Sequence, residues 1–200
     1  MEYKNKRRLI LGISLFLLLV FYLFKNISTS LRVFSFIFGM VIFYLGDHMF
    51  EIEYKFRHYL YMMTILLFGF LLSPLFFISA NYDKILHLIS PFLGCLLIFH
   101  IIDKKKLSMQ WKLLITFTFI MSFLTFHEIG EYLIDSLWDL KLQGVYLRTI
   151  SGLEKLDLFM SRIDDTMIDL IIGTLSSLVF VLGKGASQYY KHHFKTKKKS

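Results

Sequence analysis

Residues 113–132 read LLITFTFIMSFLTFHEIGEY, an apolar run whose ionisable side chains all lie in its last six positions. A transmembrane helix needs about 20 predominantly apolar residues, because the hydrocarbon core of a bilayer is about 30 Å thick. A helix also satisfies its own backbone hydrogen bonds in lipid. The run is too continuous for the alternating pattern of a membrane β-strand. This stretch therefore predicts a membrane-spanning α-helix.

The composition of the whole chain extends this prediction. Of the 200 residues, 56% are hydrophobic and 19% are charged, whereas a soluble domain has about 45–50% apolar and about 25% charged residues. We expect an all-α, polytopic membrane helix bundle that forms one domain over residues 1–200, and an ordinary soluble enzyme is excluded. The expected transmembrane spans are residues 9–24, 31–45, 60–80, 85–102, 113–132 and 165–182, followed by a basic tail over residues 183–200.

The lysines and arginines predict the orientation of these six spans. Sixteen of them fall on the side that holds both termini, and seven fall in the connections on the opposite side. Because cytoplasmic segments carry the excess of Lys and Arg, both termini are expected in the cytoplasm and the chain in the cell membrane. The tail residues Lys195–Lys199 are expected to lie against anionic lipid headgroups. The net charge of +8 is thus explained by the membrane, without nucleic acid as a partner.

Ionisable residues inside the last three spans are the unusual feature of this sequence. Each charged group near the bilayer centre costs about 2.5–3.5 kcal/mol on insertion scales, so such groups indicate function. The fourth span opens with Asp83 and His87, the fifth ends with His127, Glu128, Glu131 and Asp135, and the sixth opens with Asp164, Asp165 and Asp169. The predicted topology places all three groups at the extracytoplasmic ends of their helices.

The helical phase of these residues predicts that they face one another. At about 100° per residue, the ionisable positions of each span fall on one face. On two spans the same face continues into small residues, which let helices approach closely. These faces are Asp83, His87, Ser90 and Gly94 on the fourth span and Asp165, Asp169, Gly173 and Ser176 on the sixth. We therefore expect one outward-opening pocket between the three helices.

Five carboxylates cannot share such a pocket in ionised form without compensation by protons, cations or a metal. An oxygen-rich ligand set with an imidazole suits Mg²⁺, Mn²⁺ or Zn²⁺. The predicted metal ligands are Asp83, His87, Glu131, Asp165 and Asp169, with Glu128 as the general base. Such a centre would generate a nucleophile from water and act as a hydrolase on a lipid-linked or cell-envelope substrate.

Two other functions remain open from the sequence. The acids can serve as a proton or cation relay in a transporter, although both polar faces turn apolar beyond Gly94 and Ser176. Alternatively, Lys84 and Arg162 neutralise the acids in a non-catalytic scaffold or regulator. The connection over residues 136–164 alternates apolar and charged residues. This pattern favours an interfacial amphipathic helix, a cap over the pocket, or a segment that seals the bundle.

The order of three short motifs resembles the YjdF-like family of small, uncharacterised bacterial membrane proteins. The motifs are Asp83-Lys84-x-x-His87, Glu128-x-x-Glu131 and Asp165-Thr166-x-x-Asp169-Leu170, within residues 60–182. The VanZ-like family is more distantly similar, but it usually has an Asn where this chain has Gly173. The resemblance implies a shared site at the matching positions and no established reaction.

Overall fold

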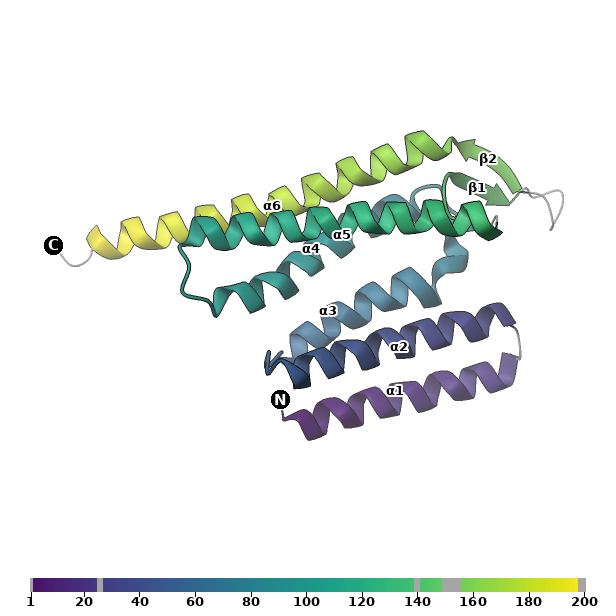
Figure 1. The fold of residues 1–200 in the computed structure, drawn as a ribbon, viewed down its shortest axis with the longest axis horizontal. Helices are drawn as coiled ribbons and strands as arrows, with labels where there is room; N and C mark the ends of the chain where they lie inside the picture. Colours follow the sequence, from purple (N-terminus) through teal and green to yellow (C-terminus); the bar gives the residue numbers. More distant parts are fainter. Residues whose placement is uncertain (1, 25–26, 139–140, 149–155, 198–200) are drawn as a thin grey trace. The chain divides into compact units, whose positions relative to one another are not determined.

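The computed structural model describes residues 2–24, 27–138, 141–148 and 156–197. Helices dominate, which confirms the predicted all-α class (Figure 1). They are α1 (Tyr3–Phe24), α2 (Ile27–Met49), α3 (Phe56–Leu66), α4 (Tyr82–Asp103), α5 (Met109–Trp138) and α6 (Arg162–Lys197). The strands β1 (Val145–Arg148) and β2 (Leu156–Met160) form a short antiparallel hairpin. The chain groups into two compact units, Met1–Leu75 and Phe76–Ser200, and the single-domain assignment stays a prediction.

Four helices within the described ranges are long and apolar enough to cross a membrane. The candidate spans are Arg32–Met49, Tyr82–Asp103, Met109–Trp138 and Arg162–Lys191. At 1.5 Å per residue, the 22 residues of α4 extend over about 33 Å, which matches the thickness of the hydrocarbon core. The count of six spans and the cytoplasmic position of both termini stay predictions.

The expected helix over residues 60–80 is wrong as a continuous element. Helix α3 ends at Leu66 and continues as a π-helical turn over Leu67–Leu71, in which the Leu72 N–H donates to the carbonyl of Leu67. A 3-10 helix follows over Ser73–Phe77. Pro74 supplies the reason, because proline disfavours the α conformation of the residue before it and donates no backbone hydrogen bond.

Helix α6 is longer than its predicted span. It continues beyond residue 182 through Lys197, because the polar residues that follow the apolar run are compatible with helix. The tail residues Lys198 and Lys199 lie outside the described residues. Contact between the tail and anionic headgroups therefore stays a prediction.

The unit Met1–Leu75 contains a buried ion pair that joins its helices. The Lys6 Nζ of α1 donates to Oδ2 of Asp47 in α2 at 2.5 Å, and the Tyr59 hydroxyl of α3 donates to the same oxygen at 2.7 Å. The Tyr54 N–H donates to the other carboxylate oxygen at 3.0 Å. Lys6 is 1% exposed and Asp47 is fully buried. Burial, with the nearby charge of Asp47, raises the pKa of the Tyr54 phenol, which therefore stays neutral.

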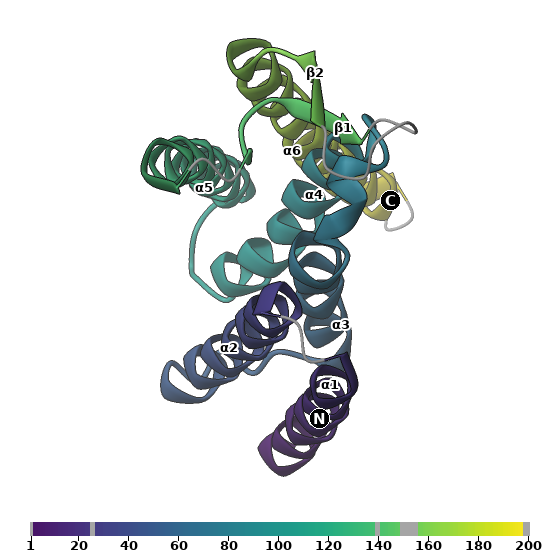
Figure 2. The ribbon, with the colours of Figure 1, turned by 90° about the vertical axis from the view of Figure 1, so that its right-hand side faces the viewer.

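In the second unit, α4, α5 and α6 lie side by side with the hairpin at one end (Figures 1 and 2). Their buried apolar core consists of Cys95, Phe99, Leu113, Ile120, Leu124 and Phe180. Two glycines allow the close approach that the sequence predicts. A Cβ atom added at Gly173 would lie 2.6 Å from a methyl group of Leu124, and one at Gly94 would lie 3.0 Å from Ile120.

The described part of the connection between α5 and α6 forms a hairpin, and not the interfacial amphipathic helix that was one of the three alternatives from the sequence. Gly144 has a φ of +84°, which an L side chain rarely adopts, and the β-favouring residues of β1 follow it. Asp135 of α5 accepts the N–H groups of Leu142 (2.8 Å) and Gln143 (3.0 Å). The Gly144 N–H donates to Asp165 of α6 at 2.8 Å. Residues 139–140 and 149–155 of this connection lie outside the described residues.

We expect Lys6→Met to lower the free energy of unfolding by about 3 kcal/mol, because it leaves the buried Asp47 charge without its cation. Adding Asp47→Asn should recover a large part of this loss. The measurement is thermal unfolding of the purified protein in detergent. Lys4→Met, at an exposed position two residues away in the sequence, is the control and should have little effect. A double variant that is no more stable than Lys6→Met would contradict the ion-pair assignment.

The replacement Asp135→Ala should loosen the segment before β1, because the N–H groups of Leu142 and Gln143 would lose their acceptor. The expected cost is about 1–3 kcal/mol. Amide hydrogen exchange over residues 142–146 should accelerate by at least about fivefold, since 1.4 kcal/mol corresponds to a factor of ten. The control is Asp157→Ala, at an exposed position of β2. Unchanged exchange in Asp135→Ala would show that the carboxylate does not hold this segment.

Candidate metal centre

The ionisable residues predicted to meet come from one end of the second unit. This end contains the start of α4, the end of α5 and the start of α6, next to the hairpin (Figure 1). We use the name acidic centre for Asp83, Lys84, His87, Glu128, Asp165 and Asp169. All six are buried or half-buried.

Local sequence signals place Asp165 and Asp169, two of the three aspartates of α6. The Asp164 N–H donates to the Ser161 Oγ at 3.2 Å, and that hydroxyl donates to the Asp164 carboxylate at 2.6 Å. A serine that binds the backbone three residues later is a helix N-cap. Because the helix begins there, Asp165 and Asp169 lie one turn apart on the same face. That face is directed toward α4.

The Lys84 ammonium lies among three aspartates. It donates to both carboxylate oxygens of Asp169 at 2.8 and 2.7 Å and to Asp83 at 3.1 Å. It also donates to Asp165 Oδ1. Lys84 and Asp83 belong to α4, whereas the other two aspartates belong to α6. This lysine therefore connects two membrane-spanning helices and compensates part of the negative charge.

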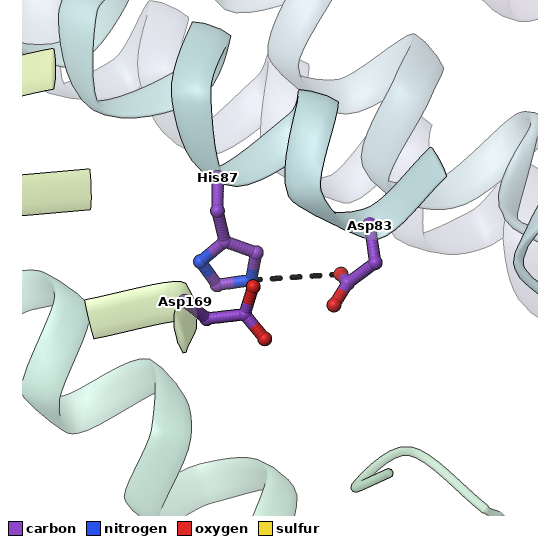
Figure 3. A group of neighbouring side chains, drawn as sticks. All are labelled: Asp83, His87 and Asp169. Carbon is purple, nitrogen blue, oxygen red and sulfur yellow. Dashed lines mark ion pairs between the residues drawn. The ribbon is translucent and has the colours of Figure 1, made fainter. Parts of the chain in front are cut away.

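Asp83, His87 and Asp169 offer ligand atoms to a common point (Figure 3). One ligand atom from each residue lies within 4.8 Å of the other two. The His87 Nε2 is 3.6 Å from Asp83 Oδ1, while the other oxygen of Asp83 faces Lys84. Ligands bind Zn²⁺ at about 2.0–2.2 Å, so two of them lie at most about 4.4 Å apart. The observed separations are therefore close to those of ligands that share one ion.

Glu128 and His87 contain polar atoms that lack hydrogen bonds within the described part of the chain. Both residues are 5% exposed. The Glu128 Oε1 has no hydrogen-bond partner and lies 3.8 Å from His87 Nε2, and His87 Nδ1 also has none. A buried polar atom without a hydrogen bond costs about 1–3 kcal/mol. A proton, an ordered water or a bound ion can each complete such an atom.

Two of the five predicted metal ligands, Asp165 and Glu131, do not belong to this group of three. Asp165 uses both carboxylate oxygens, one for Lys84 and the other for the Gly144 N–H. Glu131 Oε1 lies 3.4 Å from Nε2 of His127, and both side chains are more exposed than Glu128. The His127 ring is 5.6 Å from the His87 ring, centre to centre. The Glu131–His127 pair therefore borders the centre.

The acidic centre carries more negative than positive groups. Lys84 is the cation that hydrogen-bonds its aspartates, whereas four carboxylates belong to it, and Glu131 adds a fifth beside it. Buried carboxylates in such excess require protons or a further cation. A divalent ion is one way to supply the missing charge.

Sequence reasoning missed the contribution of the hairpin to this site. The Gly144 N–H bonds directly to Asp165, and the Gln143 side-chain amide donates to the Thr166 hydroxyl at 3.2 Å. A glycine before a short β-favouring run was the available signal for this turn. Only one of the sequence hypotheses, the non-catalytic scaffold in which Lys84 and Arg162 neutralise the acids, predicted a role for Lys84.

Comparison with known protein families agrees with this membrane-helix architecture. The chain matches the family described as "Predicted membrane protein (DUF2238)" over residues 5–187. No curated protein and no solved structure matches the chain. These comparisons support an uncharacterised membrane family, whereas the narrower YjdF-like resemblance stays a prediction and the VanZ-like one gains no support. Since the match covers nearly all 200 residues, the chain belongs to the DUF2238 family of predicted membrane proteins.

Proposed function

We propose that this protein binds a divalent metal ion at Asp83, His87 and Asp169 and hydrolyses a lipid-linked or cell-envelope substrate. The observation that carries the proposal is the convergence of three ligand atoms within 4.8 Å. Beside them lies a buried Glu128 oxygen that has no hydrogen-bond partner among the described residues. The three ligands belong to α4 and α6, and Glu128 belongs to α5. The packing of these three helices therefore brings the four side chains together.

The chemistry of the donors supports Mg²⁺, Mn²⁺ or Zn²⁺ as the ion. Two carboxylates and one imidazole are ligands that these metals share. The excess of carboxylates over Lys84 favours a doubly charged ion. Lys84 hydrogen-bonds Asp83 and Asp169 and so restricts the positions of both carboxylates. In known metal sites, groups that hydrogen-bond to the metal ligands orient those ligands.

The residues suit a hydrolytic reaction. The metal, when bound, lowers the pKa of water and stabilises negative charge on the substrate. Glu128 is placed to accept the proton from the attacking water, because its Oε1 lies beside His87 and is not used in another hydrogen bond. Asp165 holds Lys84 and the Gly144 backbone instead of the ion. Within this proposal, Glu131 and His127 form an outer pair that can receive the proton next.

The apolar core disfavours transport as the function. Beyond Asp169 and His87, the helices pack through Gly173 and Gly94 against Leu124 and Ile120. The Ser176 hydroxyl bonds to the carbonyl of Leu88 at 2.5 Å. A proton or cation relay would need polar groups through the membrane.

One observation favours the structural-network reading as a second candidate. Lys84 hydrogen-bonds all three aspartates of the centre. An ion network of this kind can hold helices together without any metal. The two functions differ in what happens when Lys84 or Asp169 is replaced.

Metal content of the purified full-length chain tests the proposed function. After incubation with Mn²⁺ or Zn²⁺ and removal of free ion, we expect about one ion per chain. His87→Ala and Asp169→Asn should weaken binding by at least about tenfold, the scale on which even outer-shell changes act. The matched control is Asp164→Asn, since this exposed aspartate neighbours Asp165 but bonds to Ser161. Absence of metal in the unaltered protein would reject the proposal.

The replacement Lys84→Met separates the metal centre from the structural network. It removes the competing cation from Asp83, Asp165 and Asp169, and each of these then needs another charge partner. In the metal-free protein, the thermal midpoint should fall. Added Mn²⁺ or Zn²⁺ should restore much of it, because a ligand that binds only the folded state stabilises that state. Rescue by a second replacement, Asp169→Asn, but not by metal would favour the non-catalytic network.

A further inference from the structure

A groove runs between α4 and α6 and ends next to the acidic centre. It consists of two adjoining hollows of about 280 and 460 Å³, which share Leu88 and Leu175. Apolar side chains continue the walls of the groove. They include Ile85, Phe92, Ile172 and Val179. Asn81 and Lys84 line the opposite end of the groove from Phe92 and Val179.

A groove forms between the two helices because the small side chain of Ser176 lies between the larger side chains of Leu88 and Leu175. Ser176 is 3% exposed, and its hydroxyl donates to the Leu88 carbonyl, which holds α4 and α6 close together. Leu88 and Leu175 are half-exposed on either side of this contact. The groove therefore has a floor where the helices meet and apolar walls that face outward.

The ends of the groove differ in polarity as the ends of a lipid do. Its walls span residues 84–93 on α4, which corresponds to about 13 Å at 1.5 Å per residue. Both helices are candidate membrane spans, so the surrounding bilayer supplies acyl chains to this face. At the polar end, the Lys84 side chain both lines the groove and hydrogen-bonds Asp83 and Asp169. One molecule can thus place a chain in the groove and its headgroup at the centre.

We propose that the groove between α4 and α6 holds one acyl chain of a phospholipid and presents the headgroup of that lipid to the acidic centre. This inference rests on the proposed function and names its substrate class. The apolar walls contact the acyl chain along its length, as the apolar lining of a ligand pocket does. A divalent ion held by Asp83, His87 and Asp169 would offset the repulsion between the phosphate and the carboxylates of the centre. Binding of the chain and approach of the phosphate are therefore separable.

A photoactivatable lipid tests the position of the chain. The full-length protein is reconstituted in nanodiscs that contain phosphatidylglycerol with a diazirine midway along one acyl chain, and labelled peptides are identified by mass spectrometry. We expect labelling of residues 85–93 and 172–179 to exceed that of the lipid-exposed α5 segment 114–123. Leu88→Trp and Leu175→Trp place a larger side chain in the groove from α4 and from α6. Each should reduce labelling of the groove by at least about fivefold, which corresponds to about 1 kcal/mol, the lower end of the cost of overpacking.

The matched control is Leu114→Trp, because Leu114 is exposed on α5 to the same extent as Leu88 on α4. It should leave the groove labelling unchanged. A thermal unfolding transition in each variant shows that the variant is folded. Two groove variants are used so that the test still holds if one of them does not fold. Even labelling of all three helices, or labelling that survives both tryptophan variants, would overturn the proposal. Displacement by unlabelled polyprenyl phosphate, but not by unlabelled phosphatidylglycerol, would overturn the choice of an acyl chain.

The same variants distinguish this inference from the proposed function. Asp169→Asn should lose the metal and keep the labelled groove, whereas Leu88→Trp should keep the metal and lose the labelling. Metal binding without preferential labelling would reject the acyl-chain site alone. Preferential labelling in a protein that binds no metal would reject the hydrolytic centre and, with it, the role of the lipid as substrate.

Discussion

The arrangement of the second unit depends on one ammonium group that is shared between helices. Lys84 of α4 hydrogen-bonds Asp165 and Asp169 of α6 as well as its neighbour Asp83. An ionised group inside a membrane span is tolerated when it is paired, and breaking a buried pair costs about 3–5 kcal/mol. This requirement fixes the contact between α4 and α6. The Ser176–Leu88 hydrogen bond then holds the same two helices deeper along their length.

Two buried charge clusters among the described residues differ in how completely their polar atoms are hydrogen-bonded. In the first unit, Lys6 and Tyr59 both donate to Asp47, and a backbone N–H binds its other oxygen. The acidic centre instead contains oxygen and nitrogen atoms of Glu128 and His87 that have no hydrogen-bond partner within the described residues. A protein gains stability from complete networks, while incomplete ones need a separate reason. This difference is why we place function in the second cluster and a structural role in the first.

The acidic centre and the groove beside it are connected through Lys84. Lys84 lines the groove, and its ammonium group bonds to the ligands of the proposed ion. Under the two proposals, a headgroup at this position would lie near the proposed metal ligands, Glu128 and the hairpin segment around Gly144. The hairpin is held there by Asp135 and Asp165, so these carboxylates act on the shape of the site. A single amphiphile would thus contact every part of the proposed machinery.

The sequence by itself determined that this chain is a helical membrane protein, because long apolar runs have one solution in lipid. Helical phase also placed Asp83 with His87 and Asp165 with Asp169, and it identified Gly94 and Gly173 as close-packing positions. The break at Pro74 and the hairpin after α5 were missed, because short irregular segments are set by local turns that hydropathy does not show. Only the tertiary structure decided which acids meet. Glu128 and Glu131 lie three residues apart, yet Glu128 adjoins His87 while Glu131 adjoins His127. The rotation of each helix against its neighbours selects between such partners, and that rotation follows from side-chain packing across all three helices.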